Sequence, residues 1–168
     1  GTVAPRDIEV RFYGRRQHWL DRRIADLGLS GLVTQGGQVS RGESLRRQRE
    51  SQLLLLLNWE DPDVSAVYPL KLFEYLAAQR PVLASGGRPQ DDVASILRET
   101  GAGVYAPTVD HVEEAIATAY HEYKRTGRVG YAGTVQAVHR YSYTEAARQF
   151  VEALDAAARR ACGGGRGG

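Results

Sequence analysis

The sequence predicts an α/β fold, a three-layer α/β/α sandwich around a mostly parallel sheet. Short β-rich runs alternate with amphipathic helical runs along the 168 residues, which is typical of parallel strands joined by crossover helices. The run QLLLLLNW at 52–59 is continuously apolar, as in a strand buried on both faces, and predicts the centre of the sheet. A chain of this length suits one domain and buries roughly 70 % of the surface that the unfolded chain exposes.

The first half of the chain supplies two strands before that central run. The segment IEVRFYG at 8–14 is the expected first strand, and GLVTQGGQV at 31–39 is the second strand with its loop. A helix between them is predicted by apolar residues at helical spacing and ends at Gly28. This stripe consists of Trp19, Leu20, Ile24 and Leu27. An Arg-rich, weakly apolar segment, 40–51, leads to the central strand.

The second half continues the alternation. A helix is predicted to begin near Pro69 and to close before Pro81, where the fourth strand, PVLASGG at 81–87, begins. The next helix ends at Gly101, and AGVYAP at 102–107 forms the fifth strand. The apolar stripe of the first of these helices is Leu70, Phe73, Leu76 and Ala77, and that of the second is Val93, Ile96 and Leu97.

Two long helices are predicted to end the domain. Asp110 with Glu113, and Ser142 with Glu145, have the spacing of a capping box, in which side chains satisfy the free amides of a helix start. The last helix carries an apolar stripe, which consists of Ala147, Phe150, Val151 and Leu154. We expect one domain over 1–161 and a flexible, glycine-rich tail over 162–168.

Composition excludes several classes of protein. The net charge of +2 gives little of the field with which nucleic-acid binders neutralise phosphates, so no nucleic-acid partner is expected. The longest apolar run, 53–57, is far shorter than the ~20 residues of a transmembrane segment. The single Cys162 fits a reducing compartment, and the predicted location is the cytoplasm. The basic cluster at 46–49 is interpreted as a solvated helix face, with contact to an anionic acceptor or to the inner face of the membrane as the alternatives.

Ligands of open parallel sheets bind at the carboxyl ends of the strands, where helix amino termini also favour anions such as a diphosphate. The loops that follow the predicted strands are rich in glycine and polar residues. Glycine allows a base or phosphate to approach the backbone closely, although glycine pairs at strand ends also form ordinary turns. The candidate crevice residues in these loops are Gly14, Gln38, Val39, Gly86 and Gly87.

One segment carries a resemblance to a known family. YPLKLFEYLAAQRPVLASGG at 68–87 resembles the P-x-K-x-x-E-Y-L-A-x-x-x-P-V-L-A signature in the carboxyl-terminal, nucleotide-sugar-binding domain of GT-B glycosyltransferases of the group 1, family 4-like type. Supporting similarities extend from about residue 8 to 153. The resemblance implies a Rossmann-like domain that forms one half of a GT-B fold.

The resemblance also implies roles for residues in this segment. In similar domains the glutamate at the position of Glu74 binds the ribose hydroxyls of the donor, and a carboxylate suits a vicinal diol because it accepts both protons. Lys71 would act as a point charge beside the diphosphate, and the region from Tyr68 through Pro69 to Leu70 would offer the amides of a helix start, although Pro69 itself has no N–H. The structural alternative is a surface ion pair between Lys71 and Glu74, worth only ~0.2–0.5 kcal/mol.

The implied function is donor binding in a glycosyltransferase that transfers a sugar from a nucleotide diphosphate sugar to an acceptor. The chain would be only the donor-binding part of this enzyme, inactive without an amino-terminal acceptor domain. Alternatives are a non-catalytic nucleotide-binding module, a nucleotide-sugar epimerase of the same architecture, or a flavodoxin-like interaction domain. Retaining members carry a second glutamate at the position of Ala66, so retention or inversion stays open.

No cofactor or obligatory metal is expected, because the nucleotide sugar is the substrate. Asp61 and Asp63 have the D-x-D form that binds a metal in another glycosyltransferase class, but Asp and Pro in such a loop are common turn formers. Family members usually hold the diphosphate with basic residues of an earlier strand and helix. The residues that could replace them here are Arg15, Arg16 and Arg41.

Overall fold

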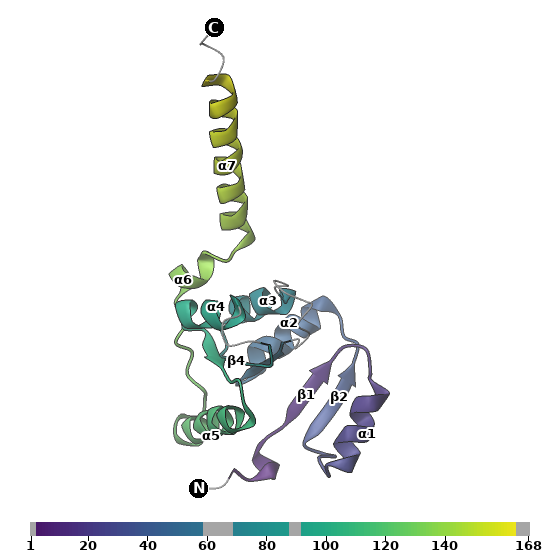
Figure 1. Ribbon diagram of the computed structural model, residues 1–168. Coiled ribbons are helices and arrows are strands. Elements are labelled where there is room, and N and C mark those ends of the chain that lie inside the picture. The colour runs from purple at the N-terminus through teal and green to yellow at the C-terminus, as the bar shows by residue number, and fades with distance from the viewer. Residues whose placement is uncertain (1–2, 59–68, 88–91, 164–168) are drawn as a thin grey trace.

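A computed structural model of the protein describes residues 3–58, 69–87 and 92–163 (Figure 1). The elements, in chain order, are η1 (Pro5–Asp7), β1 (Val10–Tyr13), α1 (His18–Asp26), β2 (Val33–Gly37), α2 (Arg41–Glu50), β3 (Leu54–Leu57), α3 (Leu70–Ala78), β4 (Val82–Ser85), α4 (Asp92–Thr100), β5 (Gly103–Tyr105), α5 (Val109–Thr126), α6 (Val135–His139) and α7 (Tyr143–Gly163). Every pairing between these strands is parallel, which confirms the predicted α/β class.

The strands form two separate sheets rather than one. β1 pairs with β2, and β3, β4 and β5 form a second sheet in that order. The prediction that 52–59 lies at the centre of the sheet is therefore wrong for this structure, because β3 is an edge strand and β4 occupies the middle. Leu57 at the end of β3 is 63 % exposed. Figure 1 shows β1, β2 and α1 as a group beside the remaining elements.

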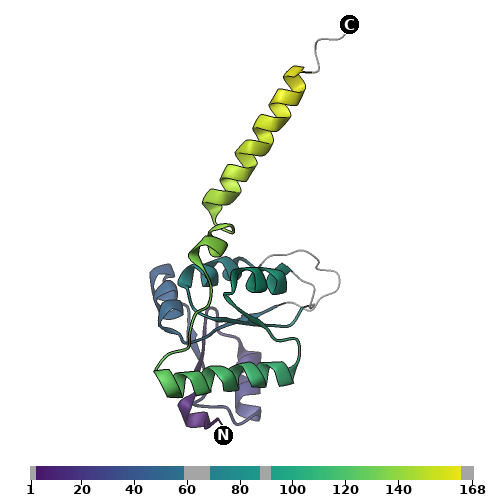
Figure 2. The same cartoon turned by 90° about the vertical axis from the view of Figure 1, so that its left-hand side faces the viewer.

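Helices cover both faces of the three-stranded sheet. Figure 2 shows α3 and α4 above the strands and α5 below them, with α1 on the same side as α5. The core is apolar and contains residues of β3, α3, β4 and α4. Its buried members are Leu54, Leu56, Leu72, Leu76, Val82, Ala84, Val93, Ile96, Leu97 and Ala102.

The buried face of α3 differs from the predicted stripe. Two members of that stripe are confirmed, because Leu76 is 1 % exposed and Phe73 packs against the core. The other two, Leu70 and Ala77, are exposed, and the fully buried Leu72 was not in the predicted stripe. Because α3 is apolar on most of its circumference, spacing alone does not select the face that packs on the sheet. In α1 likewise Ile24 is buried, but Trp19, also in the predicted stripe, is 66 % exposed.

Only one of the two predicted helix starts has the predicted cap. Ser142 accepts a hydrogen bond from the amide of Glu145 at 3.2 Å, which confirms the first residue of that capping box. The prediction that a helix begins near Asp110 is confirmed, because α5 begins at Val109, but the N-cap is Thr108, which accepts from the amide of His111, and not Asp110. Asp110 lies within the first turn.

The cap of α5 provides a test of this assignment. We expect Thr108→Ala to lower the free energy of unfolding by about 0.5–2 kcal/mol, because an amide at the helix start loses its acceptor. Asp110→Ala should have a smaller effect, since Asp110 only favours the helix dipole. Denaturant unfolding of both variants measures this difference, and a larger effect of Asp110→Ala would contradict the assignment.

The end of the chain contains a third helix that the sequence did not reveal. The short α6 separates α5 from α7, and α7 projects away from the other elements in both views (Figures 1 and 2). Its apolar stripe is present but unburied, with Phe150 66 % and Leu154 54 % exposed. Among the described helices, none combines the length and the hydropathy that a membrane crossing requires.

Candidate functional site

The carboxyl ends of the parallel strands place the candidate loops at one edge of the molecule. The amide of Gly14, after β1, donates to the carbonyl of Gly37 at 2.9 Å. In the other sheet, the amide of Asn58 donates to the carbonyl of Ser85 at 2.7 Å. The loops after β1 and β2 are thus neighbours, as are those after β3 and β4.

The start of α3 is set by proline. Pro69 occupies the N-cap position with φ −66° and ψ 117°, and its carbonyl accepts from the amide of Leu72 at 2.8 Å. Proline suits a helix start because its missing N–H would have no intrahelical partner there. Burial of Leu72 and Leu76 against the core then fixes the rotation of α3, which turns Glu74 toward α2.

Glu74 lies between α3 and α2. Its Oε1 atom is 3.4 Å from Nη1 of Arg41, and its Oε2 atom accepts from Nε2 of Gln48 at 3.5 Å. Both distances are at the long end of hydrogen bonding, so the carboxylate is held weakly. Its side chain is 35 % exposed, against 79 % for that of Arg41. Glu74 is therefore oriented by the protein but still accessible from solvent.

Gln48 is a residue that sequence reasoning missed. It is 9 % exposed in a helix that is otherwise rich in arginine, and its Nε2 also lies 3.4 Å from Oγ of Ser44. Its Oε1 atom is buried without a hydrogen-bond partner among the described residues. The sequence gives no signal for this role, because a glutamine in a polar helix resembles any solvated residue.

The predicted alternative for Lys71 is not found. Lys71 is exposed in the first turn of α3, and no ion pair joins it to Glu74 among the described contacts. Glu74 pairs with Arg41 instead. Leu70, also a predicted site residue, is exposed at the same helix start, whereas Tyr68 lies outside the described residues.

The remaining predicted residues divide into two groups. Gln38 and Val39 directly precede Ser40, the N-cap of α2, so they adjoin the helix whose Arg41 contacts Glu74. Gly86 and Gly87 follow β4 with φ of 79° and 74°, values that favour glycine. The carbonyl of Gly86 accepts from the hydroxyl of Tyr105 at 3.1 Å. No contact in the described part of the chain joins these two glycines to Glu74.

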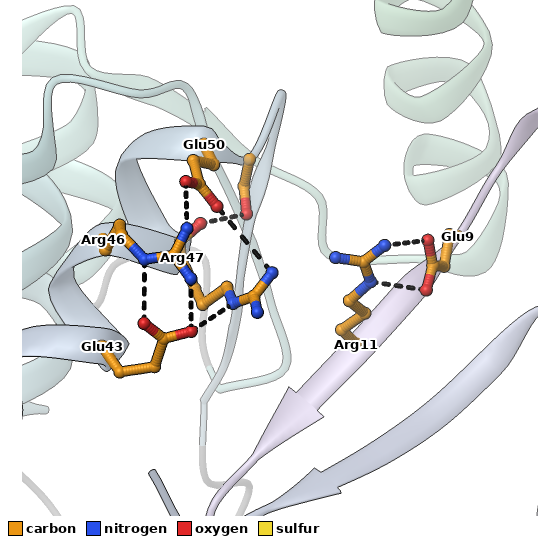
Figure 3. A network of polar contacts seen from close by, with 7 residues as sticks. Glu9, Arg11, Glu43, Arg46, Arg47 and Glu50 are labelled. Carbon is orange, nitrogen blue, oxygen red and sulfur yellow. Dashed lines mark hydrogen bonds and ion pairs between the residues drawn. The ribbon is translucent and has the colours of Figure 1, made fainter. Parts of the chain in front are cut away.

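The arginines near the site are mostly engaged with carboxylates. Arg16 pairs with Asp21 at 2.8 Å, which leaves Arg15 as the candidate that makes no ion pair among the described residues. On α2, Arg46 and Arg47 bind Glu43, and Arg46 also binds Glu50 (Figure 3). Arg46 and Arg47 of the basic cluster are thus paired with carboxylates of the same helix, in agreement with its interpretation as a solvated helix face.

Tyr75, the residue after Glu74 in α3, is a partly buried aromatic neighbour of the site. Burial raises the pKa of Tyr75, and the negative charge of Glu74 raises it further. The Tyr75 hydroxyl lies 3.4 Å from the carbonyl of Leu55 on β3.

No group of three potential metal ligands occurs among the described residues, and Asp61 and Asp63 lie outside them. A cavity between α4 and β5 contains no predicted site residue.

The fold is that of one half of a GT-B glycosyltransferase. The Anabaena protein Alr3699/HepE, solved in complex with UDP, matches with a TM-score of 0.66 at 17 % identity over 89 % of this chain and 41 % of its own. AviGT4, a glycosyltransferase involved in avilamycin A biosynthesis, matches with a TM-score of 0.64 at 18 % identity, over 93 % of this chain and 44 % of its own. The chain thus spans less than half the length of these proteins. No family model matches the sequence, and no curated protein matches it significantly.

Proposed function

We propose that this chain is the donor-binding half of a glycosyltransferase and binds a nucleotide diphosphate sugar at the carboxyl ends of its strands. The observation that carries the proposal is the position of Glu74, an accessible carboxylate held between α2 and α3 beside the loop after β2. The likeness to glycosyltransferase structures, one of them with UDP, supports the same ligand class.

Glu74 is suited to bind ribose. Its two oxygens can accept from two vicinal hydroxyls, and the weak contacts to Arg41 and Gln48 orient the group without occupying every lone pair. The nearby loop residues Gln38 and Val39 would contact the base or ribose. Gly14, Gly86 and Gly87 would allow the backbone to approach the rest of the donor.

Lys71 would supply positive charge beside the diphosphate at the start of α3. We expect Lys71→Ala to weaken UDP binding more than uridine binding, and salt to remove most of this difference, because the contribution is that of a point charge in water. Lys124→Ala is the matched control, since Lys124 lies on α5 and pairs with Asp7. Titrations at two salt concentrations measure both variants, and equal losses for UDP and uridine would contradict the role.

Calorimetric titration tests the function itself. UDP, GDP, dTDP and ADP, and their sugar conjugates, are titrated into the chain with EDTA present and again with Mg²⁺. The proposal expects saturable binding of at least one diphosphate in EDTA, because no step of recognition relies on a metal. Absence of binding for the whole set under both conditions would reject the proposal.

The chain alone is expected to bind a donor without transferring its sugar. Transfer requires the donor and acceptor to be held in reactive geometry, and this chain covers less than half of the enzymes it resembles. An assay for sugar transfer and for release of nucleotide diphosphate checks this expectation. Turnover by protein purified to homogeneity would show that the chain is catalytically complete.

A further inference from the structure

The last helix, α7, has an exposed apolar face. In both views α7 projects away from the other elements (Figures 1 and 2). Tyr143 is 83 % exposed, Phe150 66 % and Leu154 54 %. Helices in folded proteins owe most of their stability to the packing of such a face rather than to intrinsic propensity. The face is therefore suited to a partner that the described part of a single chain does not supply.

The small and large apolar residues of this face follow a heptad spacing. They are Tyr143, Ala147, Phe150, Leu154 and Ala157, separated alternately by four and three positions, and are called the α7 seam below. This is the spacing of the a and d positions of a coiled coil. A period of 3.5 residues keeps one seam turned toward a neighbouring helix over its whole length. The spacing therefore favours another helix as the partner.

The sizes of the seam residues are symmetric about position 152. Phe150 and Leu154 lie two positions on either side of it, and Ala147 and Ala157 lie five. When a second copy of α7 runs antiparallel about this midpoint, Phe150 lies opposite Leu154 of the second copy, and Ala147 lies opposite Ala157 of the second copy. Large side chains then meet large ones and alanines meet alanines. A two-fold contact between identical chains requires this self-complementarity.

The charges beside the seam favour the same antiparallel arrangement. Arg148 and Asp155 are one heptad apart on one flank of the seam, four positions before and three positions after the midpoint. An antiparallel pair places Arg148 beside Asp155 of the second copy at both ends, whereas a parallel pair places each residue beside its like-charged equivalent, which is unfavourable. Within one helix Arg148 pairs with Glu145 and Glu152, so Asp155 of the second copy would extend an existing cluster.

The position of the rest of the chain also favours antiparallel copies. Figures 1 and 2 show the sheets and the other helices at the amino-terminal end of α7. α7 has 21 residues, and a helix of that length is about 31 Å long. Antiparallel copies place their remaining elements at opposite ends of this length. Parallel copies would bring them to the same end, where they would compete for space.

The seam offers enough apolar area for a dimer. A stable interface buries roughly 1,200–2,000 Å² in total, and one aromatic side chain buries roughly 150–250 Å². Two copies would bring together four exposed rings, those of Tyr143 and Phe150 in each chain. These rings alone supply about half of the required area, and the exposed Val151 and Leu154 of both copies add to it.

We propose that α7 joins two copies of this chain as an antiparallel, two-fold helix pair. The α7 seam is the contact, with Phe150 and Leu154 at its centre and with Arg148 and Asp155 along one flank. The pair would hold the two sheet-containing parts at opposite ends. No nucleotide contact is involved, so this association and donor binding can fail independently.

The first test measures association of the full chain by analytical ultracentrifugation. We expect the wild-type chain to dimerise reversibly as its concentration is raised to a few hundred micromolar. Leu154→Lys should weaken dimerisation about tenfold or more, because it places a charge against Phe150 of the second copy. Leu154 is 54 % exposed in the single chain, so this variant should keep its fold, which circular dichroism checks.

Gln149→Lys is the matched control. Gln149 lies two residues after Ala147, about 200° around the helix and therefore opposite the seam. The same new side chain at this position should change dimerisation by less than about twofold. Equal weakening by both lysines would overturn the proposal, and so would a wild-type chain that stays monomeric at the highest concentration. The second result would assign the seam to a different partner.

The second test measures register and direction by disulfide cross-linking. Ala147→Cys and Ala157→Cys are made separately in a Cys162→Ser background, so that each chain carries one cysteine. An equal mixture should form a disulfide between the two variants, identified by peptide mapping. Either variant alone should form about tenfold less, because its two cysteines would be about 15 Å apart along the antiparallel pair, too far for a disulfide.

Two cross-linking results would contradict this arrangement. Efficient linkage of Ala147→Cys to itself would show a parallel pair. The same yield from the mixture as from the mixture after unfolding in denaturant would show that linkage is due to random collision, and that α7 does not pair with a second copy.

Discussion

Glu74→Gln is expected to weaken nucleotide binding about tenfold while leaving the fold intact. Charge-assisted hydrogen bonds contribute roughly 1.5–3 kcal/mol, and neutral ones about 0.5–1.5 kcal/mol, so the substitution loses on the order of 1.4 kcal/mol. Part of this loss should disappear with a 2′-deoxyribose nucleotide, which lacks one of the two hydroxyls. Titration of both variants with UDP and dUDP measures the difference.

The structure also predicts what this substitution does to stability. Glu74 makes one partly exposed ion pair with Arg41, so Glu74→Gln should change the free energy of unfolding by less than ~1 kcal/mol. Glu113→Gln on α5 is the matched control for loss of one negative charge. Unchanged affinity in Glu74→Gln, with wild-type binding established in parallel, would reject the ribose role of Glu74.

Leu72→Ala is expected to have the largest effect on stability, lowering the free energy of unfolding by about 2–5 kcal/mol. Leu72 is fully buried in the core between α3 and the sheet, and its truncation loses apolar burial and leaves a cavity. Leu70→Ala, two residues earlier in the same helix, should change stability by less than ~0.5 kcal/mol because Leu70 is 72 % exposed. Denaturant unfolding of both variants provides the comparison, and a larger effect at Leu70 would mean that the predicted stripe, not the observed one, faces the core.

The order of strands and helices could be predicted from sequence because each element has a local signal. Alternating β-rich and helical runs indicated all five strands, and glycines indicated the ends of α1 and α4. The pairing of strands had no such signal. The leucines of β3 predicted a central strand, but β3 is an edge strand in the structure. An apolar run indicates that a strand is suited to burial on both faces, and it does not identify the neighbouring strands.

The candidate site was predictable in its location and only partly in its contacts. Strand ends in a parallel sheet meet at one edge by topology, so the loops after β1 to β4 could be chosen from sequence. The partners of Glu74 could not, because Arg41 and Gln48 are 33 and 26 residues away in the chain. Helix spacing favoured Lys71 as the partner, but packing of Leu72 and Leu76 rotates Glu74 toward α2 instead.

The projecting α7 means that the chain has two regions with separate melting behaviour. α7 is held by local interactions, among them the pairs that Arg148 makes with Glu145 and Glu152, whereas α3 and α4 share a core with the strands. Heating should therefore unwind α7 before the core opens, and one calorimetric transition will not describe the whole chain. Circular dichroism reports the sum of both events. In a Trp59→Phe variant, which removes the second tryptophan of the chain, fluorescence of Trp19 reports the region that contains α1, so the two signals will give different midpoints for the same sample.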